Sequence, residues 1–340
     1  MGWQEEAVRL RDDGKTYPEI ARFLREKYHR IFSAEQIRGL YRRRKEGQRI
    51  LKERIEFEDI RKTDPADIDE FIEEVIRLQD KQNRLDTRQV DASLKIHDDK
   101  PIGIALTADW HIGGWGTDLR LLRDDVNRMA DTEGLYVVFL GDAGDNYIGG
   151  APPGAQFEQI IRPGEQFAIA EYFFLKLKKQ ILAAVQGCHD TWSDKQANHN
   201  FIADVTQKIE ALNLWHGGTL EVRLGDECYR GHLRHKFRGE SQFNPLLPCR
   251  RMMEHYGVAD WAALAHKHFC AMQQSQMEGQ DVLFVRPGSY KVLDNHGQQI
   301  GGYAGLPRVP VLILYPNIHR LDCYLTLEAG IEALRHARGA

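Results

Sequence analysis

Four short apolar runs in the middle of the chain each end in residues that can bind metals or transfer protons. The runs cover residues 102–108, 135–140, 181–185 and 261–264. Short continuous apolar runs bounded by glycine or polar residues are typical of buried strands. Asp109 and His111 follow the first run, and residues two apart on an extended chain point the same way. Both side chains can therefore reach one point in space.

The other three runs end in similar chemistry. The second is followed by Asp142 and Asp145, the third by Cys188, His189 and Asp190, and the fourth by His266 and His268. In sheets of alternating strands and helices, sites lie outside the carboxyl ends of the strands. A carboxylate oxygen beside an imidazole nitrogen suits Mn, Fe or Zn better than Ca or Mg. Core histidines and turn aspartates are the alternative interpretation, and four coincident strand ends disfavour it.

The remaining pattern predicts an α/β body around these strands. Expected elements are a first strand at 91–96, helices at 118–129, 163–179 and 198–212, two strands within 219–237, a strand at 282–285 and closing strands at 309–314 and 321–325. Tyr147–Gly154 is dense in Gly and Pro, which predicts a loop, and we interpret it as a candidate substrate loop. Residues 88–330 are expected to form this body and 331–340 a C-terminal tail, and the last fifteen residues are expected to contain a terminal helix.

Residues 1–48 form a different, basic module. Residues 3–54 hold fifteen Lys and Arg against nine Asp and Glu, or +6, while the whole chain carries −4 and the remainder therefore −10. Apolar spacing predicts three helices, the second opening near Pro18 and the third behind a capping box that starts at Ser33. Such a trio resembles a helix-turn-helix, in which the third helix enters the DNA major groove. The candidate nucleic-acid-binding residues are Arg38, Arg42, Arg43, Arg44 and Lys45. A small bundle with a solvated basic face is the alternative.

Residues 49–87 read as a helical connector. Apolar residues recur three and four apart, as at Phe71, Val75 and Leu78. This spacing fits a pairing helix, and hence a possible homodimer, or equally a solvated linker.

The amino-acid composition is that of an ordinary globular protein and does not alter the predicted fold. The 340 residues are 42% hydrophobic and 28% charged, as in ordinary globular proteins. The N-terminus lacks the basic and apolar regions of a signal peptide, and no run approaches the ~20 apolar residues of a membrane span. Five scattered cysteines without a CxxC pair fit reduced thiols, which leads us to expect a cytoplasmic protein.

The motifs D-x-H, G-D-x-x-D, G-N-H-D, a lone His and G-H-x-H follow one another between Lys100 and Tyr315. This order resembles the calcineurin-like metallophosphoesterase superfamily, including its nuclease and phosphodiesterase branches. Two departures are visible: Cys188 replaces the Asn of G-N-H-D, and Ala265 replaces the Gly of G-H-x-H. The resemblance implies a four-layer αββα sandwich carrying two divalent metal ions, Mn first, with Zn, Fe or Mg as alternatives.

The resemblance also implies a ligand set. One metal takes Asp109, His111, Asp142 and His268, and the other takes Asp142, His235, His266 and Cys188. We choose His235 as the lone histidine, with His232 as the alternative. A hydroxide between the metals would attack phosphorus, while His189, oriented by Asp145, stabilises the transition state or protonates the leaving oxygen. Cys188 can bind as a thiolate that favours softer ions such as Zn, or fail to bind.

The substrate expectation combines both parts of the chain. Asn146 and Asp190 differ from the Arg and Glu of the superfamily's Ser/Thr phosphatase branch. Together with the basic module, they lead us to expect a metal-dependent DNA nuclease related to phage proteins. One alternative is a phosphomonoesterase or small-molecule phosphodiesterase whose N-terminal helices only dimerise. Another is a DNA-binding regulator with a decayed metal site.

Overall fold

The computed structural model describes residues 2–54, 65–85, 91–148, 155–241, 243–293 and 307–339, and contains two compact units. The N-terminal unit is Met1–Leu85 and the C-terminal unit is Asp86–Ala340. Part of the predicted connector (55–64 and 86–87) and most of the predicted substrate loop (149–154) lie outside the described residues.

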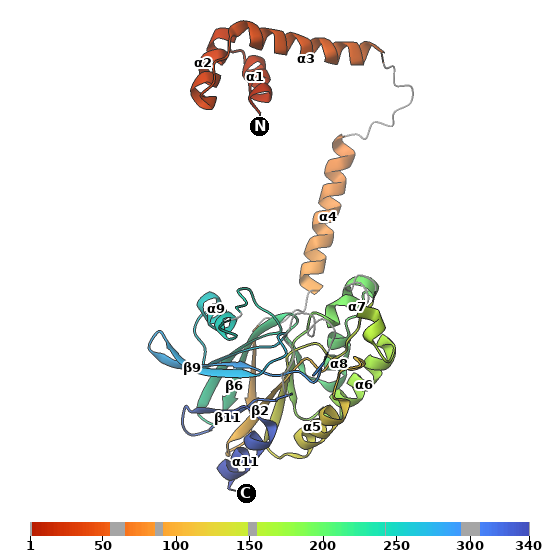
Figure 1. Cartoon of the computed structure of the whole chain (residues 1–340), viewed down its shortest axis with the longest axis vertical. Coiled ribbons are helices and arrows are strands. Elements are labelled where there is room, and N and C mark those ends of the chain that lie inside the picture. The colour runs from red at the N-terminus through yellow and green to blue at the C-terminus, as the bar shows by residue number, and fades with distance from the viewer. Residues whose placement is uncertain are drawn as a thin grey trace. The chain divides into compact units, whose positions relative to one another are not determined.

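The N-terminal unit is made of helices (Figure 1). Its helices are α1 (Trp3–Asp12), α2 (Tyr17–Tyr28), α3 (Ala34–Arg54) and α4 (Pro65–Leu85). The predicted capping box is confirmed, since Gln36 N donates to Ser33 Oγ (3.1 Å) and Ser33 N to Gln36 Oε1 (3.0 Å). Ile20, Leu24 and Ile37 are fully buried between α1, α2 and α3. These three helices therefore share one hydrophobic core.

The C-terminal unit contains two six-stranded sheets. One has the order β1 (Asp91–Ile96), β6 (Gly217–Leu224), β7 (Glu227–Arg234), β8 (Trp261–Leu264), β10 (Gln280–Arg286), β9 (Ala271–Met277). The other has the order β12 (Leu321–Tyr324), β11 (Val311–Leu314), β2 (Ile102–Thr107), β3 (Leu135–Phe139), β4 (Ile181–Ala184), β5 (Leu212–Asn213). Strands β2, β3, β4 and β5 are parallel, so their carboxyl ends lie at the same edge.

Alternation along the strands builds four layers. On β2, Ile104 and Leu106 face the other sheet, whereas Ala105 faces the helices. Helices α5 (Leu119–Asp131), α6 (Pro163–Lys176), α8 (Phe201–Ile209) and α11 (Leu327–Arg338) cover the β2 sheet, and α9 (Leu247–Tyr256) covers the β8 sheet. Figure 1 shows α5, α6 and α8 on one side of this unit and α9 on the other. The predicted αββα sandwich is confirmed.

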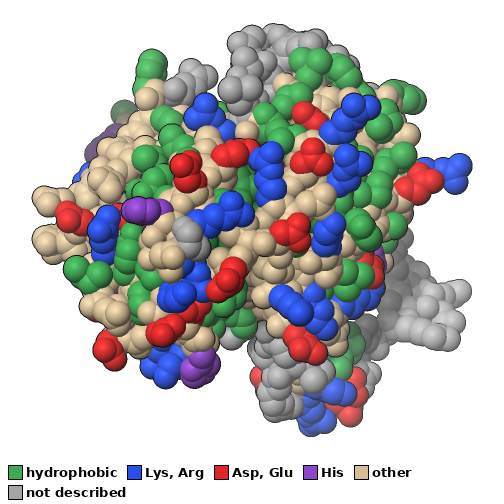
Figure 2. Space-filling view, turned by 90° about the horizontal axis from the view of Figure 1, so that it is seen from below, with side chains coloured by type: hydrophobic (Ala, Val, Ile, Leu, Met, Phe, Trp, Pro, Cys, Tyr) green, Lys and Arg blue, Asp and Glu red, His purple; other side chains and the backbone are tan. Residues whose placement is uncertain are grey.

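Some elements were not predicted. They include α7 (Asp190–Ala197), α9, β9 and the short 3₁₀ helix η1 (Ala155–Glu158). Helix α11 crosses the predicted boundary at residue 330, and its Ile331 and Leu334 are buried in the core. On the face of Figure 2, basic and acidic side chains are interspersed. No helix in the described ranges is both long and apolar enough to cross a membrane.

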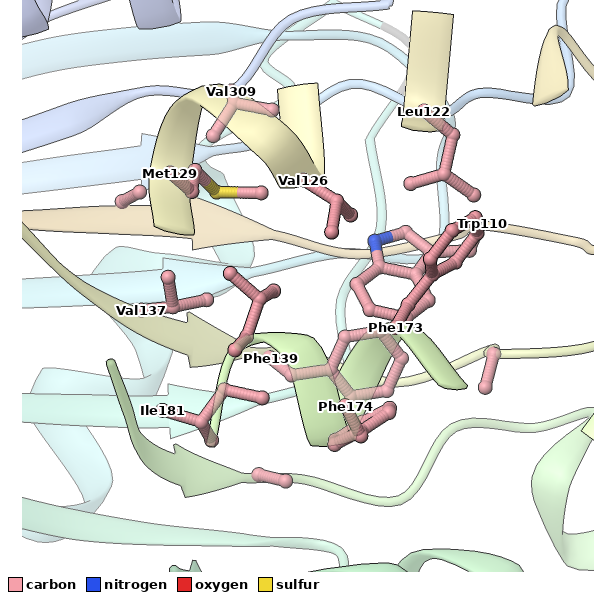
Figure 3. Packing of buried hydrophobic residues seen from close by; sticks show 14 of the residues in the cluster. Trp110, Leu122, Val126, Met129, Val137, Phe139, Phe173, Phe174, Ile181 and Val309 are labelled. Atoms are coloured by element: carbon pink, nitrogen blue, oxygen red, sulfur yellow. The ribbon is translucent and has the colours of Figure 1, made fainter. Parts of the chain in front are cut away.

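Trp110 lies at the centre of the core between the β2 sheet and its helices (Figure 3). It is fully buried, and its ring centroid lies 4.7 Å from that of Phe139 and 5.3 Å from that of Phe174. Its Nε1 donates to Thr107 Oγ1 (2.8 Å). We expect Trp110→Ala to lower the free energy of unfolding by about 3–5 kcal/mol, measured by urea denaturation.

Trp115→Ala is the matched control, because this indole is 41% exposed. It should change the free energy of unfolding by less than about 1 kcal/mol. Equal losses in the two variants would show that Trp110 is not a centre of the core.

Candidate metal centre

Five strand ends bring the predicted ligands together. Asp109 and His111 follow β2, Asp142 follows β3, Cys188 follows β4, His235 follows β7, and His266 and His268 follow β8. Four trios of described residues have ligand atoms within 4.8 Å of one another, and two of them contain Asp142: His111 with Asp142 and His189, and Asp109 with Asp142 and His235. The other two trios are separate: Asp109 with His111 and His268, and Cys188 with His235 and His266. These trios match the two predicted ligand sets without Asp142.

Asp142 lies between the two trios. Its Oδ2 is 3.9 Å from His111 Nε2 and 3.1 Å from His235 Nε2, so one oxygen faces a histidine of each set. Its Oδ1 accepts a hydrogen bond from His189 N (2.8 Å), which fixes the carboxylate. This is the position that a carboxylate bridging two cations needs.

The first trio converges on one point. Asp109 Oδ1 lies 3.9 Å from His111 Nε2 and 3.7 Å from His268 Nε2, and the two Nε2 atoms are 3.0 Å apart. Asp109 Oδ1 is buried and has no hydrogen-bond partner among the described residues. Two imidazole nitrogens and a carboxylate oxygen that point at one another are well placed to share a cation.

Hydrogen bonds set which histidine nitrogen faces the centre. His111 Nδ1 donates to Asp145 Oδ1 (3.0 Å), and His235 Nδ1 donates to the carbonyl oxygen of Leu140 (2.8 Å). Because each Nδ1 directs its proton toward an acceptor, Nε2 is the nitrogen that faces the centre and would bind a metal when it carries no proton. These outer contacts are those of ligating histidines.

The two alternatives for the lone histidine, one in β7 and one directly after it, make different contacts. His232 Nε2 lies 2.8 Å from the carbonyl oxygen of Gly257, and its Nδ1 lies 3.1 Å from Thr219 Oγ1. Both ring nitrogens are thus engaged away from the centre, whereas His235 lies within it. The predicted preference for His235 agrees with this geometry.

The electrostatics favour a positive charge at the centre. Burial lowers the pKa of His111 to about 4 and that of His266 to about 3, so both rings are neutral. Burial alone would raise the pKa of Asp142, but His235 outweighs it and holds that pKa well below its usual value. Burial, partly opposed by His235, raises the pKa of Asp109 to about 7. Neutral imidazoles around an anionic carboxylate form a donor set for divalent cations.

The backbone at the centre adopts unusual conformations. Asp109, His111, Asp142, His266 and His268 all have positive φ, between 44° and 75°. Non-glycine residues rarely adopt such angles, and they cluster at functional sites. A Cβ added to Gly187 would lie 2.1 Å from Asp142 Oδ1, so the loop needs glycine there.

His189 lies beside the cluster, and Asp145 contacts it differently from the expectation. The ring Nδ1 of His189 donates to the main-chain carbonyl of Asp145 (2.5 Å), while the Asp145 carboxylate pairs with His111. The ring of His189 lies 4.3 Å from Trp192 and 5.1 Å from Tyr147, centroid to centroid. Its Nε2 is therefore the atom available to a substrate.

Several positioning residues were not assigned from the sequence. The Asp190 carboxylate accepts hydrogen bonds from the backbone of Asp142 (2.8 Å), Ala143 (3.0 Å) and Gly187 (2.8 Å), tying two loops together. Lys291 is buried and donates to Asp145 Oδ1 (2.9 Å). Asp190 adjoins a recognised motif, but nothing near Lys291 in the sequence signals its role.

The residues present fit a centre for divalent metal. The possible ligands combine carboxylate and imidazole groups, and the Asp142 carboxylate lies between the two trios. Asp109 Oδ1, which is buried and has no hydrogen-bond partner among the described residues, belongs to the first trio. Burial alone would lower the pKa of His235, but Asp142 outweighs it and raises the pKa well above its usual value, so this ring holds a proton that a metal would displace.

Cys188, which stands where the G-N-H-D motif has Asn, can be tested directly by substitution. It is half-exposed and shares a ligand group with His235 and His266. Because a neutral amide oxygen suits Mn better than sulfur does, we expect Cys188→Asn to raise Mn-dependent turnover of bis-p-nitrophenyl phosphate several-fold. Cys228→Asn, exposed on β7, is the control and should change nothing. Equal or lower turnover in Cys188→Asn would refute this expectation.

The candidate nucleic-acid residues lie on α3 of the N-terminal unit. Arg38, Arg42, Arg43, Arg44 and Lys45 are all exposed. The Arg38 guanidinium lies 5.3 Å from the centre of the Tyr17 ring, and Lys45 Nζ lies 3.5 Å from Asp12 Oδ1. The structure thus places the predicted residues on an exposed surface.

Comparisons with known proteins find solved structures that are similar to this chain at low sequence identity. No family model and no curated protein matches the chain. Similar solved structures include a Vps29 mutant from Entamoeba histolytica (12% identity, TM-score 0.37, covering 66% of this chain and 97% of that one). Others are a metallophosphoesterase from Sphaerobacter thermophilus (15%, 0.33, 70% and 94%) and the calcineurin-like phosphoesterase YfkN from Bacillus subtilis (10%, 0.36, 71% and 96%). The activity of this chain has to be inferred from its own side chains.

Proposed function

We propose that this protein is a dinuclear-metal-dependent phosphodiesterase that acts on DNA. The observation that carries the proposal is the position of Asp142, whose carboxylate faces a histidine of each trio. Two divalent ions held there would generate a nucleophile from water at neutral pH and offset charge on the phosphoryl oxygens. Mn is the metal we expect first, with Zn, Fe or Mg as alternatives.

The chain's own groups would complete the reaction. His189 is outside both trios, and its Nδ1 is held by the Asp145 carbonyl, so its Nε2 can protonate the leaving oxygen. Asp145 acts through His111, whose ring it orients, and Lys291 holds Asp145 in place. Asp190 keeps the β3 and β4 loops in register, which positions Asp142 and His189 together.

The basic helix α3 supports DNA as the substrate. Its five exposed cations supply sequence-independent attraction to a phosphate backbone. This attraction weakens as the salt concentration rises, because releasing the counterions condensed on DNA then gains less free energy. A basic surface of this kind is a footprint of nucleic-acid binding. The small-molecule phosphodiesterase and the DNA-binding regulator are the competing functions.

The test is cleavage of labelled single- and double-stranded DNA with Mn, using the full chain. We expect cleavage of at least one DNA form. Turnover of bis-p-nitrophenyl phosphate without DNA cleavage would leave a small-molecule phosphodiesterase. Salt-dependent DNA binding without hydrolysis of either substrate would leave the regulator.

A further inference from the structure

We infer that a second substrate site, which binds an unpaired nucleotide of a nucleic-acid strand, lies beside the metal centre. It is a pocket of about 500 Å³ lined by Arg234, Lys236, Phe237, Arg238, His255 and Tyr256, here called the β7–α9 pocket. The inference rests on the proposed function, because the strand that the pocket binds is the strand that the metal centre would cleave.

The pocket is positively charged without an internal counter-charge. Three of its six lining residues are cationic and none is acidic. Arg234 Nη2 donates to Tyr256 Oη (2.8 Å), and Arg238 Nη2 donates to His255 Nδ1 (3.2 Å), so neither of these contacts is made with a carboxylate. No acidic side chain in the described part of the chain pairs with either arginine or with Lys236. An anion such as a phosphodiester would supply the missing charge.

The pocket is also aromatic. The Arg234 guanidinium lies 5.3 Å from the centre of the Tyr256 ring and 5.8 Å from that of Phe237, and Arg238 lies 5.7 Å from Phe237. Tyr256 is 44% exposed, so its ring is accessible. Aromatic rings and arginine planes are the surfaces on which unpaired bases stack. Alternating cations and rings therefore favour a single strand over a free phosphate.

Four of the six lining residues of the pocket are close in the chain to His235, a ligand of the proposed metal centre. Arg234 and Lys236 are the neighbours of His235, and consecutive Cα atoms are about 3.8 Å apart. Arg238 is three residues from His235, so its Cα lies at most about 11 Å away. At about 3.4 Å per stacked nucleotide, that distance spans a few nucleotides. The pocket would hold a base flanking the phosphate at the metals.

The experiment measures binding without turnover. The full chain without added metal is titrated against a fluorescent thymidine hexanucleotide and an abasic hexamer of equal charge. We expect the thymidine strand to bind about 10-fold more tightly, within the range for stacking of one base. Tyr256→Ala should abolish this preference, Tyr256→Phe should keep it, and Arg234→Ala should weaken binding of both strands.

The controls separate this site from the rest of the molecule. Arg223→Ala removes an arginine paired with Glu221 at the far end of the β6–β7 hairpin, and should change neither affinity. The α3 cations contribute equally to every variant. Equal affinity for the two strands in the parent, or a preference that survives in a folded Tyr256→Ala, would overturn the inference. Failed hydrolysis with the preference intact would instead count against the proposed phosphodiesterase.

A different observation carries a second proposal: α4 pairs with α4 of a second copy of this chain. Six large apolar residues of this helix are 36–64% exposed: Ile68, Phe71, Ile72, Val75, Ile76 and Leu78. Ile68, Phe71, Val75 and Leu78 follow the 3-4-3 spacing of a coiled-coil seam. Such a face is stable only when it is covered.

Charge selects the second copy, in antiparallel orientation. The first half of the helix carries Asp69, Glu70, Glu73 and Glu74, whereas the second carries Arg77 and Lys81 with Asp80. Antiparallel pairing sets the acidic half of one helix beside the basic half of the other, and parallel pairing opposes like charges.

The test is light scattering of the full chain, whose mass is 39.1 kDa. We expect a dimer of about twice that mass, reduced to a monomer by Val75→Glu but not by Glu73→Gln on the polar face. Glu74→Lys should weaken the dimer, and adding Lys81→Glu should restore it. A monomeric parent, or no restoration by the double change, would overturn the proposal.

Discussion

His189→Ala is expected to lower the rate of DNA cleavage by about 10²–10⁴-fold, the usual contribution of a general acid. The ring lies beside the cluster with Nδ1 committed to the Asp145 carbonyl, so the variant removes a proton donor and leaves both ligand trios in place. Metal content should therefore stay at two ions per chain. Turnover of bis-p-nitrophenyl phosphate should fall less, because its leaving group needs little protonation.

His199→Ala is the matched control. This histidine is about half-exposed and pairs with Asp204 (3.3 Å), away from the cluster, so its loss should leave cleavage unchanged. If His189→Ala loses a metal ion, the ring is a ligand. If both substrates slow equally, His189 acts through charge stabilisation instead of protonating the leaving group.

Asp142→Asn is expected to have the larger effect, because this carboxylate faces both trios. An amide offers only a neutral oxygen where the carboxylate presents the anionic Oδ2 to both trios. Metal affinity should fall by more than the 10–100-fold typical of changes to residues that only hydrogen-bond to the ligands. Metal-ion catalysis contributes several kcal/mol, so turnover should fall by about 10³-fold or more. Calorimetric Mn titration and initial rates measure the two losses.

The control for Asp142→Asn is Asp125→Asn. Asp125 is also a buried carboxylate of the C-terminal unit, but it accepts a hydrogen bond from Tyr290 Oη (2.8 Å) and lies outside the metal groups. Its amide can still accept that bond, so Mn binding should persist. A melting temperature that rises with Mn in both variants would show that Asp142 is not required for binding.

The sequence predicted the four strands and the residues at their ends because that pattern is local. In an apolar run that ends in Asp-x-His, one short window indicates a buried strand, the end at which it stops and the possible metal ligands there. Helices α7 and α9 lack such signals: α7 is only eight residues long, and α9 is defined by packing of Met252 and Met253 against a distant sheet. Their positions depend on tertiary contacts that no short window contains.

Within the site, the sequence predicts which residue types could bind metal. It does not predict the backbone conformations and long-range contacts that hold those residues in place. The left-handed backbone at Asp109 and Asp142 is imposed by surrounding loops, since neither residue type requires it. The contact of Lys291 with Asp145 joins residues 146 positions apart. For the same reason, the sequence placed the Asp145 carboxylate on His189, whereas it holds His111.

The most direct measurement is the rate of bis-p-nitrophenyl phosphate hydrolysis by metal-free full-length protein as Mn is added back. We expect negligible turnover without metal, a rise with added Mn, and saturation near two equivalents per chain. Hydrolysis that is unaffected by removing metal would contradict a metal centre. Inertness with Mn, Zn, Fe and Mg alike would contradict the enzyme and favour a DNA-binding protein with a decayed site.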